Sequence, residues 1–252
     1  MIWVNADGQR FEAAAFVFDK DGLLFASKGF WIALAEERLT QIRKLGSQRL
    51  TMEWAKCFGV DTPDGISVVD VDASGILAIA SPTEEITATA ALIVQATGMR
   101  WTEARDRAND IFRQADLDLD LRKALRPQRG FPGIMERLRQ KGIPYGVATS
   151  DTEQRVLDSF RMFDDPDALA FIISPKDVKR GKPNPDMLEE ISRRLNVPTS
   201  QLAMVGDSYV DVEMARRAGA VGIGVPETEE MRCQMHELGA IVLEHLDQIQ
   251  FE

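Results

Sequence analysis

Residues 14–22 read AAFVFDKDG, five apolar residues followed at once by two aspartates and a glycine. An apolar run of this length is typical of a buried strand, and Gly22 lets the chain bend away from its end. Asp19 and Asp21 lie two residues apart on this turn, so both can point toward one cation. By itself the pattern Asp-x-Asp-Gly is more often an ordinary turn. Its meaning therefore depends on the residues at the ends of the other strands.

Four more apolar runs have the length and composition of buried strands. They span residues 144–148, 170–173, 202–205 and 220–225. Amphipathic segments with helix start and stop signals lie between them, at residues 131–142, 185–196 and 208–218. Strands that alternate with helices predict βαβ units, and therefore an α/β fold with a parallel sheet.

The region after the first strand has a different pattern. Residues 28–125 predict helices over 29–45, 49–58, 83–97 and 101–115, without a strong parallel-strand run between them. A connection between a strand and the next helix normally takes ~2–6 residues, so an insertion of this size predicts a second domain. We therefore expect a core of residues 1–26 and 127–252, with an inserted helical domain of residues 27–126.

Composition excludes several classes of protein. The chain has 30 Lys+Arg against 40 Asp+Glu, a formal charge of −10, which argues against nucleic acid or anionic membrane as a partner. No apolar run approaches the ~20 residues that span a bilayer, and the N-terminus lacks the pattern of a secretory signal. Two cysteines cannot form a disulfide framework, which indicates a reducing, cytoplasmic location. One of them, Cys57, is expected to be a small core residue of a helix.

Histidine usage narrows the chemistry further. The only two histidines are His236 and His245, both near the end of the chain. A Ser-His-Asp or Cys-His hydrolase needs an imidazole beside its nucleophile, and a zinc enzyme usually needs two or three histidine ligands. If the chain is an enzyme, carboxylates are expected to carry the proton and metal chemistry.

Polar groups follow each of the other central strands. Thr149 and Ser150 follow the second strand, with Asp151 as the expected N-cap of the next helix. Asp207 and Asp211 follow the strand at 202–205. Ligands of open α/β sheets bind beyond the carboxyl ends of the strands, so these groups should share one crevice with the first two aspartates.

That crevice would hold several carboxylates, a hydroxyl and the ammonium of Lys182, which lies in the rigid turn KPNPD at residues 182–186. Carboxylates packed closely repel one another unless a divalent cation lies among them, and an all-oxygen set of ligands suits Mg²⁺. The hydroxyl and the lysine are the donors that the oxygens of a phosphoryl group require.

In this combination the sequence resembles the haloacid dehalogenase superfamily. The residues DKDG at 19–22, Thr149, Lys182 and GDSYVD at 206–211 match the four motifs of that superfamily in order. The match covers residues 14–24 and about 131–226 of the chain. It implies a Rossmann-like core. The insertion resembles the helical C1-type cap of the phosphoglycolate phosphatase and β-phosphoglucomutase branch.

The resemblance implies a role for each matching residue. Asp19 would be the nucleophile that forms an aspartyl-phosphate, and it would also coordinate Mg²⁺. Asp21 would be the general acid and then the general base, with its backbone carbonyl on the metal. Thr149 would hydrogen-bond the phosphoryl oxygens, and Lys182 would neutralise charge on the nucleophile and the phosphate.

The resemblance implies further contacts with the metal. Asp207 would be a direct metal ligand, while Asp211 would contact the metal through water or orient the groups around it. Ser150 and Lys28 are candidates for contact with the substrate, as is the long connection at residues 59–82. The position between the two aspartates, here Lys20, is not expected to contribute a catalytic side chain.

Three functions remain open at this point. A Mg²⁺-dependent phosphatase acting on a small phosphorylated metabolite, such as phosphoglycolate or a sugar phosphate, would use all these residues. A phosphosugar mutase would use the same two aspartates, and a non-catalytic binding or regulatory protein could keep the fold. Dehalogenation is disfavoured by the presence of Asp21. A leaving halide needs no proton, so the dehalogenases of the superfamily lack an acid two positions after the nucleophile. The chain is expected to act as a monomer or a homodimer.

Overall fold

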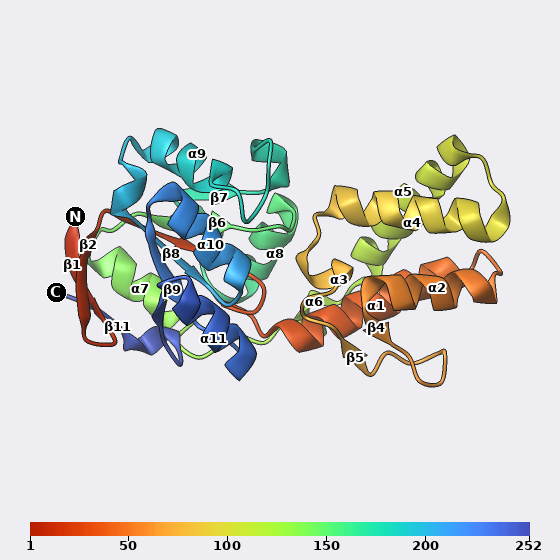
Figure 1. Cartoon of the computed structure of the whole chain (residues 1–252), viewed down its shortest axis with the longest axis horizontal. Helices are drawn as coiled ribbons and strands as arrows, with labels where there is room; N and C mark the ends of the chain where they lie inside the picture. The colour runs from red at the N-terminus through yellow and green to blue at the C-terminus, as the bar shows by residue number, and fades with distance from the viewer. The chain divides into compact units, whose positions relative to one another are not determined.

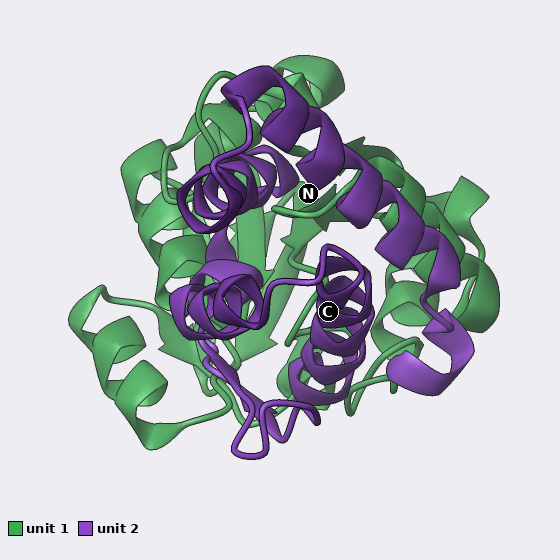
Figure 2. Ribbon diagram, turned by 90° about the vertical axis from the view of Figure 1, so that its right-hand side faces the viewer, with its two compact units in different colours: residues 1–26, 126–252 green, residues 27–125 purple.

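The computed structural model describes all residues from 1 to 252. The chain divides into two compact units (Figures 1 and 2), one made of Met1–Ala26 and Arg126–Glu252, the other of Ser27–Leu125. The second break lies one residue before the boundary expected from the sequence. No helix is long and apolar enough to cross a membrane.

The first unit is built on a sheet of six parallel strands. Its strands are β3 (Ala15–Phe18), β6 (Tyr145–Ala148), β7 (Phe171–Ile173), β8 (Leu202–Gly206), β9 (Val221–Gly224) and β10 (Ile241–Val242). Their order in the sheet is β10-β9-β8-β3-β6-β7. This confirms the predicted parallel α/β fold, and each of the five apolar runs forms a strand.

The strand order reverses beside β3. From β3 the chain builds outward through β6 and β7, then returns to place β8 on the other edge of β3. Phe18, the last residue of β3, is aligned with Val147 of β6 and Val205 of β8. The residues that follow these three strands therefore meet at one end of the sheet, at the switch point where open α/β sheets bind ligands.

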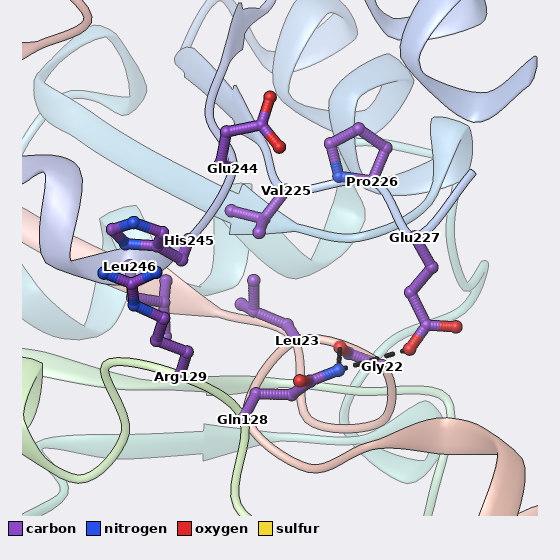
Figure 3. Close-up of a pocket in the computed structure, with 10 residues that line it drawn as sticks. All are labelled: Gly22, Leu23, Gln128, Arg129, Val225, Pro226, Glu227, Glu244, His245 and Leu246. Atoms are coloured by element: carbon purple, nitrogen blue, oxygen red, sulfur yellow. Dashed lines mark hydrogen bonds between the residues drawn. The ribbon is translucent and has the colours of Figure 1, made fainter. Parts of the chain in front are cut away.

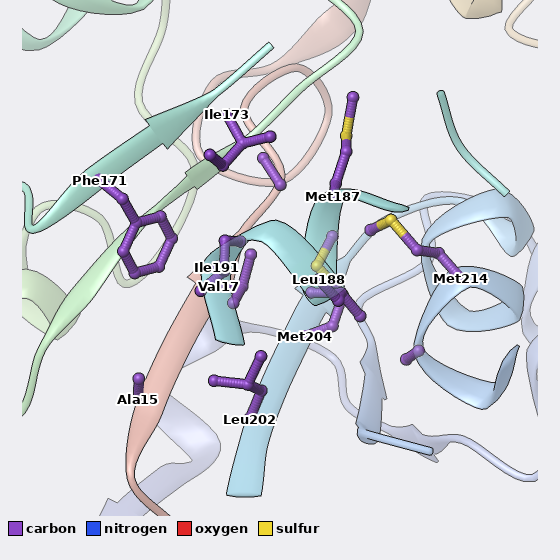
Figure 4. Packing of buried hydrophobic residues seen from close by; sticks show 12 residues of the cluster. Ala15, Val17, Phe171, Ile173, Met187, Leu188, Ile191, Leu202, Met204 and Met214 are labelled. Atoms are coloured by element: carbon purple, nitrogen blue, oxygen red, sulfur yellow. The ribbon is translucent and has the colours of Figure 1, made fainter. Parts of the chain in front are cut away.

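Helices bury both faces of this sheet. They are α7 (Gly133–Gln140), α8 (Glu153–Phe163), α9 (Asp186–Leu195), α10 (Tyr209–Ala218) and α11 (Glu229–Glu237), with the short 3₁₀ helices η1 (Pro166–Ala168), η2 (Pro175–Asp177), η3 (Thr199–Gln201) and η4 (Leu246–Gln248). One hydrophobic cluster joins Val17 of β3 to Ile191 of α9 and Met214 of α10 (Figure 4). Phe16, which alternates with Val17, points to the opposite face and meets the ring of Phe251 edge-on at 5.4 Å.

A second sheet of three antiparallel strands joins the two ends of the chain. It contains β1 (Ile2–Ala6), β2 (Gln9–Ala13) and β11 (Ile249–Phe251), in the order β11-β1-β2. The turn between β1 and β2 holds Asp7 and Gly8 at φ of 49° and 74°. Two positive φ values are what a tight two-residue hairpin requires. This sheet was not predicted from the sequence.

The inserted unit is mainly helical. Its elements are α1 (Ser27–Arg43), α2 (Gln48–Phe58), β4 (Val60–Asp61), β5 (Asp70–Val71), α3 (Ile76–Ile79), α4 (Pro82–Thr97), α5 (Trp101–Asp118) and α6 (Leu121–Ala124). Trp54 stacks on Phe58 at a centroid distance of 4.3 Å, and its indole N–H donates to Thr89 Oγ1 at 2.9 Å. The expectation for Cys57 was wrong: its side chain is exposed, because the buried face of α2 is formed by Trp54 and its neighbours.

Candidate active site

Three carboxylates meet at the switch point of the sheet. Asp19 directly follows β3, and Asp207 directly follows β8, with Asp211 in the first turn of α10. One oxygen from each lies within 4.8 Å of the other two. Every donor in this set is a hard oxygen, the type of ligand that Mg²⁺ and similar divalent cations prefer. The donor chemistry therefore fits a divalent metal.

Two glycines make this close approach possible. Gly22 has φ of +93°, and a Cβ atom on it would lie 1.9 Å from Asp207 Oδ2. A Cβ atom on Gly206 would lie 2.3 Å from Cβ of Asp211. Both distances are far inside van der Waals contact, so a side chain at either position would displace a carboxylate of the cluster.

Lys182 holds two of the carboxylates together. Its Nζ donates to Asp19 Oδ1 at 2.5 Å and lies 2.6 Å from Asp211 Oδ1. Burial disfavours the ammonium, but the two carboxylates outweigh that effect and raise the pKa of Lys182. Asp211 is held on its other oxygen by the hydroxyl of Ser208, which donates to Oδ2 at 2.6 Å. The lysine is therefore a fixed positive charge beside Asp19.

Burial dominates the ionisation of the clustered carboxylates. It raises the pKa of Asp19 to about 7, against the opposing effect of Lys182 and with the help of Asp211. Burial and the charge of Asp19 raise the pKa of Asp207 well above its usual value. Closely packed buried carboxylates resist ionising at the same time, because their negative charges repel one another. Such a cluster is expected where a bound cation balances these charges.

Thr149 brings a hydroxyl to the same end of the sheet. It directly follows β6, the neighbour of β3, and its side chain is buried. Its Oγ1 accepts the backbone N–H of Asp151 at 3.0 Å, so the hydroxyl hydrogen is free to be donated elsewhere. Ser150, the next residue, is half-buried.

Asp21 belongs to a separate group of charges. Lys20 Nζ donates to Asp21 Oδ1 at 2.5 Å and lies 3.0 Å from Asp151 Oδ2. Arg155 of α8 donates to the other oxygen of Asp151 at 2.7 Å. Burial raises the pKa of Asp21, although Lys20 opposes this, whereas Arg155 and Lys20 overcome burial and lower the pKa of Asp151.

This group corrects one expectation from the sequence and adds one residue to the site. Asp151 is not the N-cap of α8, because the hydroxyl of Thr152 accepts the N–H of Arg155 in that role. Lys20, a position not expected to contribute a catalytic side chain, is fully buried among charged groups of the site, which the sequence did not predict. The signal that could have found it is its place between two aspartates of a buried turn, where only an ion pair allows burial of an ammonium.

A cavity of about 170 Å³ borders the loop after Asp21 (Figure 3). It is lined by Gly22, Leu23, Gln128, Arg129, Val225, Pro226, Glu227, Glu244, His245 and Leu246. Gln128 Nε2 donates to the carbonyl of Gly22 at 3.1 Å and to Glu227 at 3.2 Å. None of the clustered carboxylates lines this cavity, and Gln128 on its wall fastens the loop that carries Gly22.

Lys28, a candidate for substrate contact, belongs to the inserted unit. It lies in the first turn of α1, and its exposed ammonium is 2.9 Å from Asp70 Oδ1 of β5. The hydrogen bond from Lys28 lowers the pKa of Asp70. This ion pair joins α1 to the long connection between α2 and α4.

The fold is a Rossmann-like parallel sheet, and its switch point carries carboxylates, a lysine and a hydroxyl. This combination defines a class of enzymes whose active sites use carboxylates in place of histidines. Within that class, the sequence model of the haloacid dehalogenase-like hydrolase family matches residues 13–219 of this chain. The match covers most of the chain, and the protein belongs to this family.

Similar sequences support the assignment over shorter stretches. The chain is 30% identical over 98 residues to phosphoglycolate phosphatase of Escherichia coli (strain K12), which covers 38% of this chain and 39% of the relative. It is 29% identical over 124 residues to an uncharacterized hydrolase of Saccharomyces cerevisiae, covering 49% of this chain and 53% of the relative. The chain thus spans about two fifths to one half of the length of these curated relatives.

Solved structures share the fold over nearly the whole chain. A family IA, variant 3 hydrolase of the haloacid dehalogenase type from Entamoeba histolytica has a TM-score of 0.61 at 18% identity, covering 95% of this chain and 96% of the other. CbbY from Rhodobacter sphaeroides, solved in complex with phosphate, has a TM-score of 0.57 at 19% identity, covering 92% and 94%. At this level of sequence identity, the structural similarity shows only that this chain shares their fold.

The raised pKa values predict how pH and Mg²⁺ act on stability. The folded metal-free protein holds a proton on Asp19 up to about pH 7, whereas the unfolded chain loses it near about pH 4. Stability of the metal-free fold should therefore fall as pH rises between these values. A saturating cation reverses the effect, so Mg²⁺ should raise the melting temperature more at about pH 8 than at about pH 5.5. At ~100 times its Kd, the gain is expected to be about 5–10 °C.

Differential scanning calorimetry of two variants checks this prediction. Asp207→Asn removes an acidic group from the buried cluster, so it should not respond to Mg²⁺ at about pH 8. Asp167→Asn, at an exposed position, should behave like the wild type. An equal gain from Mg²⁺ in Asp207→Asn and the wild type would contradict the assignment of the metal site.

Proposed function

We propose that the protein is a Mg²⁺-dependent phosphatase that hydrolyses a small phosphomonoester through an aspartyl-phosphate on Asp19. The observation that carries the proposal is the position of Asp19: it directly follows the central strand, binds Lys182 at 2.5 Å and lies within 4.8 Å of Asp207 and Asp211. A buried carboxylate with a lysine and further acidic residues around it is the arrangement that phosphoryl transfer to a carboxylate requires.

Asp19 and Lys182 would act together in the first step. A carboxylate oxygen of Asp19 forms a bond to phosphorus while the bond from phosphorus to the leaving oxygen breaks. The ammonium of Lys182, held by Asp19 and Asp211, neutralises charge on the nucleophile and on the phosphoryl oxygens. Because the lysine is already in place, it reorganises little as the reaction proceeds.

Asp21 would move the proton. Its carboxyl group protonates the leaving oxygen. The resulting carboxylate then takes a proton from the water that attacks the aspartyl-phosphate, the bond from phosphorus to Asp19 breaks, and inorganic phosphate leaves. The side chain is about nine-tenths buried, and burial raises its pKa, which favours the protonated form needed in the first step.

Thr149 would bind the transferred group. Its hydroxyl accepts the N–H of Asp151, which leaves its hydrogen for a phosphoryl oxygen, and Ser150 beside it offers a second hydroxyl. Asp19, Asp207, Asp211 and the backbone carbonyl of Asp21 would hold Mg²⁺, which supplies electrostatic stabilisation for the negative charge of the phosphoryl group.

We assign substrate selection to the inserted unit, Ser27–Leu125, as a C1-type cap. It enters the chain a few residues after Asp21, between the nucleophile loop and the rest of the core. The similarity to phosphoglycolate phosphatase supports a small phosphorylated metabolite, of the phosphoglycolate or sugar-phosphate type, as the substrate.

A panel of small phosphomonoesters tests the activity. Mg²⁺ should support release of inorganic phosphate from at least one ester, and EDTA should abolish it, because the carboxylates and the phosphate repel one another without a cation. Conversion of a phosphosugar to its isomer without net phosphate release would indicate a mutase instead. Absence of phosphate release and of isomerisation across the panel would refute the proposal.

Two isosteric variants separate the nucleophile from the acid and base. Asp19→Asn lacks the anionic oxygen for attack and should give no phosphoenzyme. Asp21→Asn keeps the metal-binding carbonyl but cannot transfer a proton. With p-nitrophenyl phosphate, whose leaving group needs little acid assistance, it should release one burst of p-nitrophenol and then stall before phosphate release. Single-turnover kinetics measures both products, and a burst from Asp19→Asn would show that another residue is the nucleophile.

Lys28 tests the role of the inserted unit. Lys28→Met should change the relative activities over the ester panel by about tenfold for its best substrate, if a single charged contact to that substrate is lost. The matched control is Lys123→Met in α6, also an exposed lysine paired with an aspartate of the same unit, which should leave the relative activities unchanged. Identical profiles for both variants would exclude Lys28 from substrate recognition.

A further inference from the structure

Lys20 is a fully buried lysine in the turn between Asp19 and Asp21. Its exposed fraction is 0%, and its Nζ lies 2.5 Å from Asp21 Oδ1 and 3.0 Å from Asp151 Oδ2. Burial of an ammonium costs several kcal/mol unless hydrogen-bonded partners of opposite charge compensate it. The two carboxylates supply that compensation, so the position of the ammonium is determined by both of them.

Asp151 is itself held in place from the other side. Its Oδ1 accepts from Arg155 at 2.7 Å and from the backbone N–H of Thr152 at 2.7 Å, while Oδ2 faces Lys20. Both contacts come from the start of α8, a regular element of the core. The chain of contacts from Arg155 through Asp151 and Lys20 therefore ends on the carboxyl group of Asp21.

The same group of residues reaches the proposed phosphate site. The backbone N–H of Asp151 donates to Thr149 Oγ1 at 3.0 Å. The carbonyl of Lys20 accepts the N–H groups of Leu24 and Phe25 at 3.0 and 3.2 Å, which closes the loop that follows Asp21. One cluster of charges thus connects the carboxyl group that would transfer the proton to the hydroxyl that would bind the phosphoryl group.

We propose that Lys20 is a positioning residue that orients Asp21 for proton transfer to the leaving oxygen. This inference rests on the phosphatase function proposed above. Lys20 binds Oδ1 of Asp21, and the other oxygen, Oδ2, carries the proton. In the first step this proton passes to the leaving oxygen as its bond to phosphorus breaks. In the second step Oδ2 takes a proton from the attacking water, whose oxygen bonds to phosphorus as the bond from phosphorus to Asp19 breaks. Lys20 makes and breaks no covalent bond.

The test compares two esters that differ in their need for an acid. Lys20→Met keeps the length and apolar stem of the side chain but removes the ammonium. With Mg²⁺ present, kcat for an alkyl phosphate should fall about 10–100-fold, because a misplaced Asp21 loses part of the rate gain of general acid catalysis. The rate of the burst with p-nitrophenyl phosphate, whose leaving group needs little acid assistance, should change less than about threefold. Lys176→Met, at an exposed lysine paired with Glu153, is the control and should change neither value.

A double variant shows whether Lys20 acts through Asp21. Lys20→Met added to Asp21→Asn should cost no more activity on the alkyl phosphate than Asp21→Asn alone, because the residue that it orients is already disabled. Asp151→Asn weakens the second contact of Lys20. Like Lys20→Met, it should lower kcat for the alkyl phosphate more than it slows the burst with p-nitrophenyl phosphate. This variant keeps the test decisive if circular dichroism shows that Lys20→Met does not fold.

The outcomes separate this inference from the proposed function. A wild-type protein inactive on both esters would refute the phosphatase proposal and this inference with it. An active wild type whose Lys20→Met and Asp151→Asn variants slow the p-nitrophenol burst as much as they lower kcat for the alkyl phosphate would overturn the inference alone. Additive losses in the double variant would overturn it as well, since they would mean that Lys20 acts independently of Asp21.

Discussion

Backbone hydrogen bonds on both edges of β3 determine where the chemistry of this protein lies. The strand pairs in parallel with β6 on one side and β8 on the other. The N–H of Asp19 continues the second ladder by donating to the carbonyl of Val205 at 2.9 Å. A shift of one residue would turn every side chain of β3 to the opposite face of the sheet. The apolar residues that bury β3 therefore also fix the carboxylate of Asp19 beside Asp207.

Two buried lysines divide the carboxylates of the site into two groups. Lys182 bridges Asp19 and Asp211, whereas Lys20 bridges Asp21 and Asp151. Replacing a buried ion pair by apolar residues is often neutral or stabilising, so such pairs are weak evidence for a role in stability alone. These ion pairs lie at the carboxyl ends of β3, β6 and β8, and not in the hydrophobic cluster between the sheet and α9. Their position therefore favours a role in the chemistry of the candidate site.

The sequence was sufficient where local pattern and topology agree. The strands β3, β6 and β8 are short apolar runs followed by polar residues, and their parallel order follows from the helices between them. The β1–β2 hairpin was missed although Asp7-Gly8 between extended segments is the signal of such a turn. The burial of Lys20 could not be predicted, because it depends on Asp151 and Arg155, which are far away in sequence and are brought near only by the pairing of β3 with β6.

The electrostatics of Asp19 would connect metal binding with the ionisation of this proposed nucleophile. Burial raises the pKa of Asp19 to about 7 even though Lys182 lies 2.5 Å away, so one ammonium does not offset the loss of water around this carboxylate. At neutral pH a metal-free site therefore holds a proton on Asp19 in a large fraction of molecules. Ligand carboxylates bind a cation in their deprotonated form, and binding releases the proton. A cation bound in the site would thus also ionise the oxygen that we propose attacks phosphorus.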